Sequence, residues 1–276
     1  MVFNSKYLKY AIESLHGRKE LRKRTLVNAV PIKVNKDDIG KITIPTPPME
    51  VQREIVRILD QFTELTAELT AELTARKEQY EYYRNELLTF KNGVSYKTLS
   101  EVCMISAGGD APKEAMSKNK TEKYFIPIIS NGTEENAVYG YTNIAKVNTP
   151  AVTIAARGTI GYAAYRDYPY YPIIRLLSVI PKETSILDTK YLYYCLKDKQ
   201  YKIPKSGIPQ LTAPELKKVE IPIPALEEQR RIVSILDRFD ALCNDLTSGL
   251  PAEIEARRKQ YEYYRDRLLT FKELEA

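Results

Sequence analysis

The chain has 276 residues, of which 43% are hydrophobic, and a formal net charge of +6. This length is enough for one or two packed domains. It holds no run of about 18 apolar residues and no N-terminal signal core, so we expect a cytoplasmic protein without a transmembrane helix. A single histidine, His16, three scattered cysteines and no GxxxxGK[ST] or GxGxxG motif argue against an enzyme. We expect no catalytic residue, metal site or cofactor.

The first 44 residues are similar to part of a module that occurs in full later in the chain. Asn4–Tyr10 reads NSKYLKY, and Asp188–Tyr194 reads DTKYLYY. We therefore interpret residues 1–44 as the last third of a first module whose beginning is missing before Met1.

An internal repeat follows this segment. The stretch Ile44–Phe62 recurs 177 residues later as Ile221–Phe239, and Ala75–Phe90 returns as Ala256–Phe271 at an offset of 181. Both copies have apolar residues at spacings of three, four and seven, which is typical of a helix with one apolar stripe. Prolines open each copy, and glutamate follows in the first turn, where it suits the helix dipole.

The first copy predicts a helix from Met49 to Lys91 that would be about 65 Å long. A solitary helix of this length would leave its apolar stripe in water, so we expect the two copies to pair as an antiparallel coiled coil. The residues that we expect to pair the helices are Ile55, Leu59, Phe62, Leu69, Leu73, Ile232, Leu236, Phe239 and Leu242.

Two features set the lengths of these helices. The tetrapeptide Thr-Ala-Glu-Leu occurs twice in tandem, at Thr66–Leu69 and Thr70–Leu73. Each unit adds about one helical turn, so the number of units is a ruler for helix length. The second copy has four extra residues at Thr247–Pro251, and its glycine and proline predict a kink or interruption there.

The segment between the helices has another pattern. Residues 94–220 hold 17 Lys and Arg against 12 Asp and Glu, and therefore carry most of the positive excess, which suits a polyanion. A solvated basic surface would also explain it. Runs rich in β-branched and aromatic residues predict strands at Tyr124–Ile129, Ala151–Ala156, Gly161–Tyr165 and Ser178–Ile180. Helices are expected at Leu99–Met104, Lys190–Lys197 and Ala213–Lys218, so we interpret the segment as an α/β module.

Several polar residues near expected turns of this module are candidates for DNA contact. Asn131 with Gly132 would reach an adenine edge, and Arg157 with Gly158 and Thr159 would reach guanine or a phosphate. An ordinary turn and a structural arginine are the alternatives. Lys205, Ser206 and Gln210 suit phosphate or base contact, and Lys118 and Lys120 suit only sequence-independent attraction. Tyr141, for which core packing is the stronger reading, and Arg166 complete the set.

Three phrases accompany the order of module tail, helix, module and helix. They are Pro224–Arg230 (PALEEQR), Ala156–Gly161 (ARGTIG) and Gly207–Leu211 (GIPQL). With them, essentially the whole chain resembles the specificity (S) subunits of type I restriction-modification enzymes. The proline-led entry to a long helix, found twice and ending in Leu-Glu-Glu-Gln in the second copy and Met-Glu-Val-Gln in the first, is the most specific of these features.

The resemblance implies a non-catalytic subunit with two target-recognition domains, each reading one half of a split DNA sequence. Two antiparallel helices hold the domains apart and dock two methyltransferase (M) subunits, and restriction (R) subunits join for cleavage. Family members with such tetrapeptides use their number to set the gap between half-sites. The fold class is then α+β with an antiparallel coiled coil.

The sequence departs from the family pattern because it holds only one complete target-recognition domain. The expected division is 1–44 as the remnant of a first domain, 45–92 as the first spacer helix, 93–221 as the complete domain and 222–276 as the second spacer helix. A homodimer would restore two domains and would favour a symmetric site. A silent or truncated product of a rearranging locus fits as well.

Other functions remain open at this point. An inactive fragment would dock the methyltransferase without reading DNA. A coiled-coil interaction protein would show no salt-sensitive affinity for double-stranded DNA, whereas a specificity subunit would show a steep salt dependence. A stand-alone nuclease would turn over substrate with a divalent metal.

Overall fold

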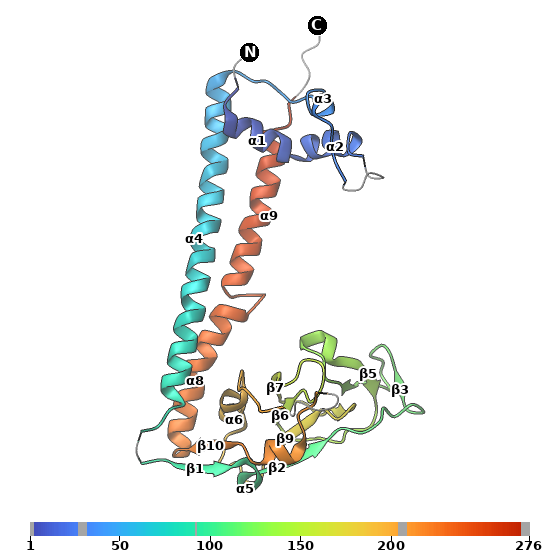
Figure 1. Ribbon diagram of the computed structural model, residues 1–276, viewed down its shortest axis with the longest axis vertical. Coiled ribbons are helices and arrows are strands. Elements are labelled where there is room, and N and C mark those ends of the chain that lie inside the picture. Colours follow the sequence, from blue (N-terminus) through green and yellow to red (C-terminus); the bar gives the residue numbers. More distant parts are fainter. Residues whose placement is uncertain (1–2, 27–31, 92, 204–208, 272–276) are drawn as a thin grey trace. The chain divides into compact units, whose positions relative to one another are not determined.

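The computed structural model describes residues 3–26, 32–91, 93–203 and 209–271 (Figure 1). The chain forms two compact units. Unit 1 comprises Met1–Gln79 with Phe239–Ala276, and unit 2 comprises Tyr80–Arg238. Within the described ranges, no helix combines the length and the apolar character that a membrane span requires.

Unit 1 is helical. Its elements are α1 (Ser5–Glu13), α2 (Leu15–Lys23), α3 (Lys36–Ile39), most of α4 (Met49–Leu87), the end of α8 (Leu226–Asn244) and α9 (Leu250–Leu268). Its core joins Tyr7, Tyr10 and Ala11 of α1 to Ile55, Val56 and Leu59 of α4 and to Leu269. In this unit α4 and α9 run side by side in opposite directions (Figure 1). The rings of Phe62 and Tyr264 stack between them, with centroids 5.4 Å apart.

The first long helix is continuous. α4 has 39 residues and ends at Leu87, four residues before the expected end at Lys91. Within the tetrapeptide stretch, the hydroxyls of Thr66, Thr70 and Thr74 donate hydrogen bonds of 2.7 to 3.0 Å to the carbonyl oxygens four residues earlier. These threonines therefore satisfy their own polar groups on the helix.

The second long helix is interrupted, as the sequence predicts. α8 ends at Asn244, and α9 begins at Leu250. The carboxylate of Asp245 accepts hydrogen bonds from the backbone N–H and hydroxyl groups of Thr247 and Ser248, which closes the turn. A Cβ on Gly249 would lie 2.6 Å from the carbonyl oxygen of Ala241, so only glycine fits there.

Unit 2 contains the sheets. One antiparallel sheet has the order β2 (Cys103–Ala107), β9 (Leu177–Pro181), β6 (Ala151–Ile154) and β7 (Ala163–Arg166). A second has the order β3 (Met116–Ser117), β5 (Val138–Thr142), β4 (Ile126–Ile129) and β8 (Tyr171–Pro172), in which β4 and β8 are parallel. β1 (Ser95–Thr98) pairs with β10 (Glu220–Ile223). The helical elements are α5 (Leu99–Val102), the 3-10 helix Glu134–Ala137, α6 (Thr189–Leu196), α7 (Ala213–Lys217), the end of α4 and most of α8. Helices beside largely antiparallel strands make this an α+β fold.

The expected helix Leu99–Met104 is wrong at its end. A capping box between Thr98 and Glu101 starts a helix, but α5 has a single turn. Cys103 is already extended, and Met104 pairs with Ile180 in β2. The five-residue ladder between β2 and β9 overrides the local helical signal. The sequence pattern also missed β5, the strand that contains Tyr141.

In unit 1, the tail helix α1 is held against the start of α4 by polar contacts. The backbone N–H of Asn4 donates to the side-chain oxygen of Gln52 at 3.0 Å. Tyr10 and Lys6 each donate to a carboxylate oxygen of Asp60 at 2.6 Å.

In unit 2, α6 is held against α8 by the same set of contacts. The backbone N–H of Asp188 donates to the side-chain oxygen of Gln229 at 2.9 Å. Tyr194 donates to Asp237 at 2.6 Å, and Lys190 donates to the other oxygen of that carboxylate at 2.8 Å. The internal repeat therefore includes the docking of the module tail on each long helix.

Candidate nucleic-acid interface

The phrase Ala156–Gly161 forms a tight loop between β6 and β7. Ala155 and Tyr162 close the loop through a 2.9 Å backbone hydrogen bond, and Gly161 donates to Ala155 at 2.9 Å. Gly158 and Gly161 have φ values of 68° and 87°, a region that residues with a side chain rarely adopt. The two glycines therefore set the path of the loop. Gly158 and Thr159 are exposed.

Asn131 ties this loop to two other segments. Its side-chain N–H donates to the carbonyl of Ile174 at 2.6 Å, and its side-chain oxygen accepts from the backbone of Ala156 at 2.8 Å. The hydroxyl of Thr159 donates to the carbonyl of Asn131 at 2.7 Å. A Cβ on the neighbouring Gly132 would lie 2.3 Å from the carbonyl oxygen of Asn136. Asn131 thus positions the loop, and pairing with a base would cost at least one of these contacts.

Arg157 is oriented by an amide. Its Nε and Nη2 atoms donate to the side-chain oxygen of Gln210 at 3.1 Å and 2.9 Å, and both residues are half-buried. The next residue, Leu211, donates its backbone N–H to Ala156 and holds this segment beside the loop. An amide accepts a hydrogen bond without neutralising the guanidinium. Within the described ranges, no carboxylate forms an ion pair with Arg157, so its positive charge stays available to an anion.

The structure thus brings together five of the predicted DNA-contacting residues, which we call the Arg157 cluster: Asn131, Arg157, Gly158, Thr159 and Gln210. Their segments are far apart in the sequence. The arrangement offers a fixed cation, exposed backbone and a hydroxyl, which are groups that contact phosphates and base edges.

The other predicted residues lie outside the cluster. Lys118 and Lys120 are exposed in the loop between β3 and β4. Tyr141 is half-buried in β5 opposite Pro127. Arg166, at the end of β7, donates to Tyr168 at 2.9 Å and to Thr153 at 3.3 Å. Lys205 and Ser206 lie outside the described residues. All of these contacts with DNA stay predictions.

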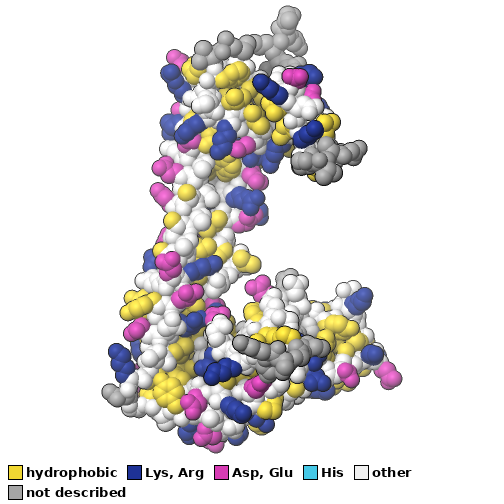
Figure 2. All heavy atoms as spheres, in the orientation of Figure 1, with side chains coloured by type: hydrophobic (Ala, Val, Ile, Leu, Met, Phe, Trp, Pro, Cys, Tyr) yellow, Lys and Arg dark blue, Asp and Glu magenta, His cyan; other side chains and the backbone are white. Residues whose placement is uncertain are grey.

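Sequence reasoning missed the groove beside the cluster. It has a volume of about 830 Å³ and is lined by residues 110–115 with Tyr139, Ile144, Ile173 and Ile174. Ile174, whose carbonyl accepts from Asn131, has a φ of 52°, which is rare for a β-branched residue. Nothing in the sequence signals this strain. On the face shown in Figure 2, Lys and Arg side chains are spread over unit 2 and do not form one patch.

The helix-pairing predictions divide into two groups. Ile55, Leu59, Ile232 and Leu236 are buried. Leu69, Leu73 and Phe239 are half-buried, as is Phe62, which stacks on Tyr264. Leu242 is 38% exposed. The ends of the long helices are therefore covered better than their middle parts, and much of the cover of Ile55 and Leu59 comes from α1.

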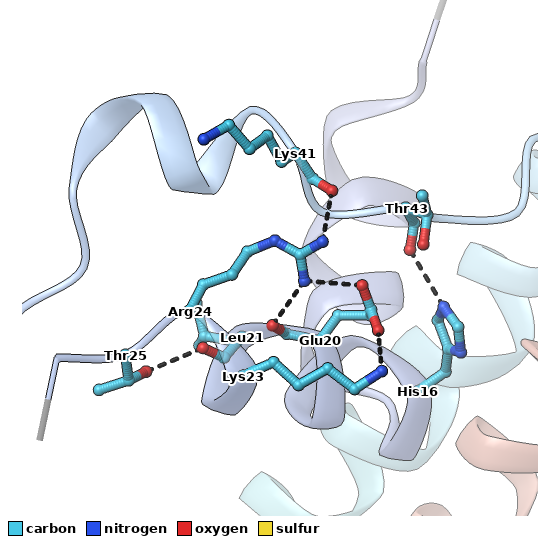
Figure 3. Close-up of polar contacts among 8 residues, drawn as sticks. All are labelled: His16, Glu20, Leu21, Lys23, Arg24, Thr25, Lys41 and Thr43. Atoms are coloured by element: carbon cyan, nitrogen blue, oxygen red, sulfur yellow. Dashed lines mark hydrogen bonds and ion pairs between the residues drawn. The ribbon is translucent and has the colours of Figure 1, made fainter.

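Within the described ranges, no three His, Cys, Asp or Glu side chains are placed to hold a metal ion. His16 faces the carbonyl of Thr43 at 3.1 Å through its Nε2 atom (Figure 3). Burial raises the pKa of the Cys103 and Cys195 thiols to about 12, so both stay protonated near neutral pH.

The comparisons with known proteins agree on one family. The profile of the type I restriction modification DNA specificity domain matches residues 3–79 and 91–256. The specificity subunit of the type I restriction enzyme EcoR124I/EcoR124II from Escherichia coli is 40% identical over 262 residues, covering 84% of this chain and 63% of that subunit. A type I specificity subunit assigned in Mycoplasma pneumoniae is 37% identical over 285 residues, covering 97% of this chain and 82% of that protein.

Solved structures share the fold. The S subunit of a type I restriction-modification system from M. genitalium has a TM-score of 0.63 at 14% identity, over 97% of this chain and 73% of that one. A chain from a structure of type I complex assembly and conformational transition has a TM-score of 0.69 at 18% identity, over 97% and 71%. The chain belongs to the type I restriction-modification specificity family, which is the recognition part of such systems and not the catalytic part.

Proposed function

We propose that this chain recognises a DNA sequence through the Arg157 cluster of unit 2. The observation that carries this proposal is the pairing of Arg157 with the amide of Gln210, which fixes the direction of the guanidinium and leaves its charge intact. A fixed guanidinium binds guanine or phosphate in two-point geometry. The exposed Gly158 and Thr159 let a DNA strand approach the loop closely.

The long helices serve assembly in this proposal. As a specificity subunit, the chain would place methyltransferase and restriction subunits on a split DNA target in the cytoplasm. The relatives' names describe type I specificity subunits and support this role. A second copy of the chain would supply a second recognition unit, and a homodimer would then read a symmetric target. The tandem tetrapeptides of α4 would set the gap between the two half-sites.

Salt-dependent binding to duplex DNA tests the proposal. The full chain is titrated against a labelled 40-base-pair duplex of mixed sequence at several salt concentrations between about 50 and 200 mM. We expect the logarithm of the binding constant to fall linearly with the logarithm of the salt concentration, because phosphate contacts release counterions. An affinity that does not change with salt, or no affinity, contradicts DNA recognition.

A matched pair of variants separates the cluster from the general surface. Arg157→Gln removes the oriented cation, and we expect about tenfold weaker binding near 0.1 M salt, the loss that one phosphate contact predicts. Arg53→Gln removes an exposed cation of α4 and serves as the control. Equal affinity of the two variants would argue against the cluster as the contact site.

A further inference from the structure

Helix α2 of unit 1 is strongly basic. Residues 14–24 contain Arg18, Lys19, Arg22, Lys23 and Arg24 against the single carboxylate of Glu20, an excess of four formal positive charges. The whole chain has a net charge of +6. This short segment therefore carries a charge density found in few other parts of the sequence.

The inner face of α2 is fixed by packing and by Glu20. A Cβ on Gly17 would lie 2.2 Å from the carbonyl oxygen of Ala11, so α2 meets the end of α1 closely. Glu20 is only 8% exposed, and it accepts from Lys23 at 2.8 Å and from Arg24 at 2.7 Å (Figure 3). Arg24 also donates to the carbonyl of Lys41 at 2.9 Å. The carboxylate of Glu20 therefore has its ion-pair partners, Lys23 and Arg24, within unit 1.

The outer face of α2 has cations that no carboxylate neutralises. Arg18, Lys19 and Arg22 are exposed, and within the described ranges none of them forms an ion pair. Residues three or four apart on a helix are neighbours, so Arg22 lies beside both Arg18 and Lys19. Like charges at these spacings destabilise a helix, and an anion bound across them would relieve the repulsion. Lys and Arg side chains recur on the visible surface of this part of unit 1 (Figure 2).

We propose that Arg18, Lys19 and Arg22 form a surface that binds the phosphate backbone of double-stranded DNA. This inference rests on the proposed DNA recognition and adds a contact region in unit 1. The surface holds no oriented base-reading group, so it contributes affinity without sequence preference.

Charge removal on α2 tests the inference in the full chain. The variant Arg18→Gln, Lys19→Gln, Arg22→Gln keeps good helix formers and removes three positive charges. Binding to the 40-base-pair duplex is measured by fluorescence anisotropy between about 50 and 200 mM salt. We expect the slope of log K against log salt to decrease in magnitude by two to three, at about 0.9 for each phosphate contact. Near 0.1 M salt this corresponds to a loss of affinity on the order of 100-fold.

Two further variants serve as controls. Arg53→Gln, Lys77→Gln, Lys91→Gln removes the same charge from exposed positions elsewhere, and its slope should stay close to that of the original chain. Arg18→Lys, Lys19→Arg, Arg22→Lys keeps the charge and should also keep the slope. Circular dichroism melting confirms that all three variants are folded.

The outcomes separate the inference from the function on which it rests. If the original chain binds the duplex and the α2 variant has an unchanged slope, the inference is wrong and DNA recognition stands. If the α2 variant instead loses only co-purification with an M subunit, the face binds an acidic protein surface, which also overturns the inference. If the original chain shows no salt-sensitive binding, the proposed function and the inference fail together.

Discussion

The hydroxyl of Tyr194 donates a 2.6 Å hydrogen bond to the carboxylate of Asp237 and so joins α6 to α8 in unit 2. The pair Tyr10 and Asp60 repeats this contact at 2.6 Å in unit 1. Each carboxylate also accepts from a lysine. The direction of each tail helix is therefore coupled to its long helix by charge-assisted bonds.

Removal of this contact lowers stability. In Tyr194→Phe, the carboxylate of Asp237 loses a donor, and we expect the free energy of unfolding to fall by about 1.5 to 3 kcal/mol, the usual range for a hydrogen bond to a charged group. Urea unfolding followed by circular dichroism measures the change. Tyr139→Phe, at a 54% exposed side chain, is the matched control and should change little. An equal effect of both variants would contradict a docking role for Tyr194.

Glu20 makes the stability of unit 1 depend on pH. Lys23 first, and then Arg24, lower the pKa of its carboxyl from 4.5 to about 2. Between these values the unfolded chain binds a proton that the folded chain does not, so stability is present above pH 4.5 and is lost as the pH falls toward 2. In Glu20→Gln we expect the urea midpoint to fall less steeply over this range. The exposed Glu50→Gln is the control, and identical pH profiles for Glu20→Gln and the original chain would refute the assignment.

The role of Gln210, the uncharged partner of Arg157, can be tested directly. Gln210→Glu keeps an oxygen at the same place but neutralises the guanidinium. We predict about tenfold weaker DNA binding near 0.1 M salt, with a smaller salt slope, because one cation is withdrawn from the phosphates. Gln210→Met leaves the charge of Arg157 intact and should retain more affinity than Gln210→Glu. The reverse order would show that the charge of Arg157 does not contact DNA.

Asn131 should act through the loop that it anchors. Asn131→Ala removes the donor to Ile174 and the acceptor for Ala156, and we expect a loss of about 1 to 3 kcal/mol in unfolding free energy. DNA affinity should fall at the same time. A variant that binds DNA weakly while keeping full stability would instead support direct base pairing by Asn131.

The tandem tetrapeptides predict a change in target spacing. Deletion of Thr70–Leu73 shortens α4 by about 6 Å and nearly keeps its phase. Since base pairs are about 3.4 Å apart, we expect the gap between half-sites to shrink by one or two base pairs with unchanged half-sites. Thr70→Ala keeps the helix length and should keep the gap. Mapping of methylated sites measures the gap in both variants. An unchanged gap after the deletion would contradict the proposal that the tetrapeptides set the gap.

Much of this fold is predictable because the segments that form it occur twice in the sequence. The offsets of 177 and 181 and the parallel between Asn4–Tyr10 and Asp188–Tyr194 indicate the long helices and the tail helix. The interruption before Leu250 follows from a glycine and a proline. The strand at Met104 could not be predicted, because its partner in β9, Ile180, lies 76 residues away and local signals favour a helix.

The candidate site was predictable in residue type but not in role. The glycines of Ala156–Gly161 indicate a special loop, and both Gly158 and Gly161 have positive φ values. That Asn131 bonds to Ile174 and that Gln210 orients Arg157 depend on segments brought together only by folding. A single sequence contains no signal for such long-range pairs.

Mapping of methylated bases measures whether unit 2 reads DNA sequence within a type I system. The chain is co-expressed with its neighbouring methyltransferase, and the methylated bases of the host DNA are sequenced. We expect one discrete motif, symmetric if the chain acts as a homodimer, which weakens or changes in Arg157→Gln. Methylation without a shared motif, or none at all from a complex that still assembles, would contradict it.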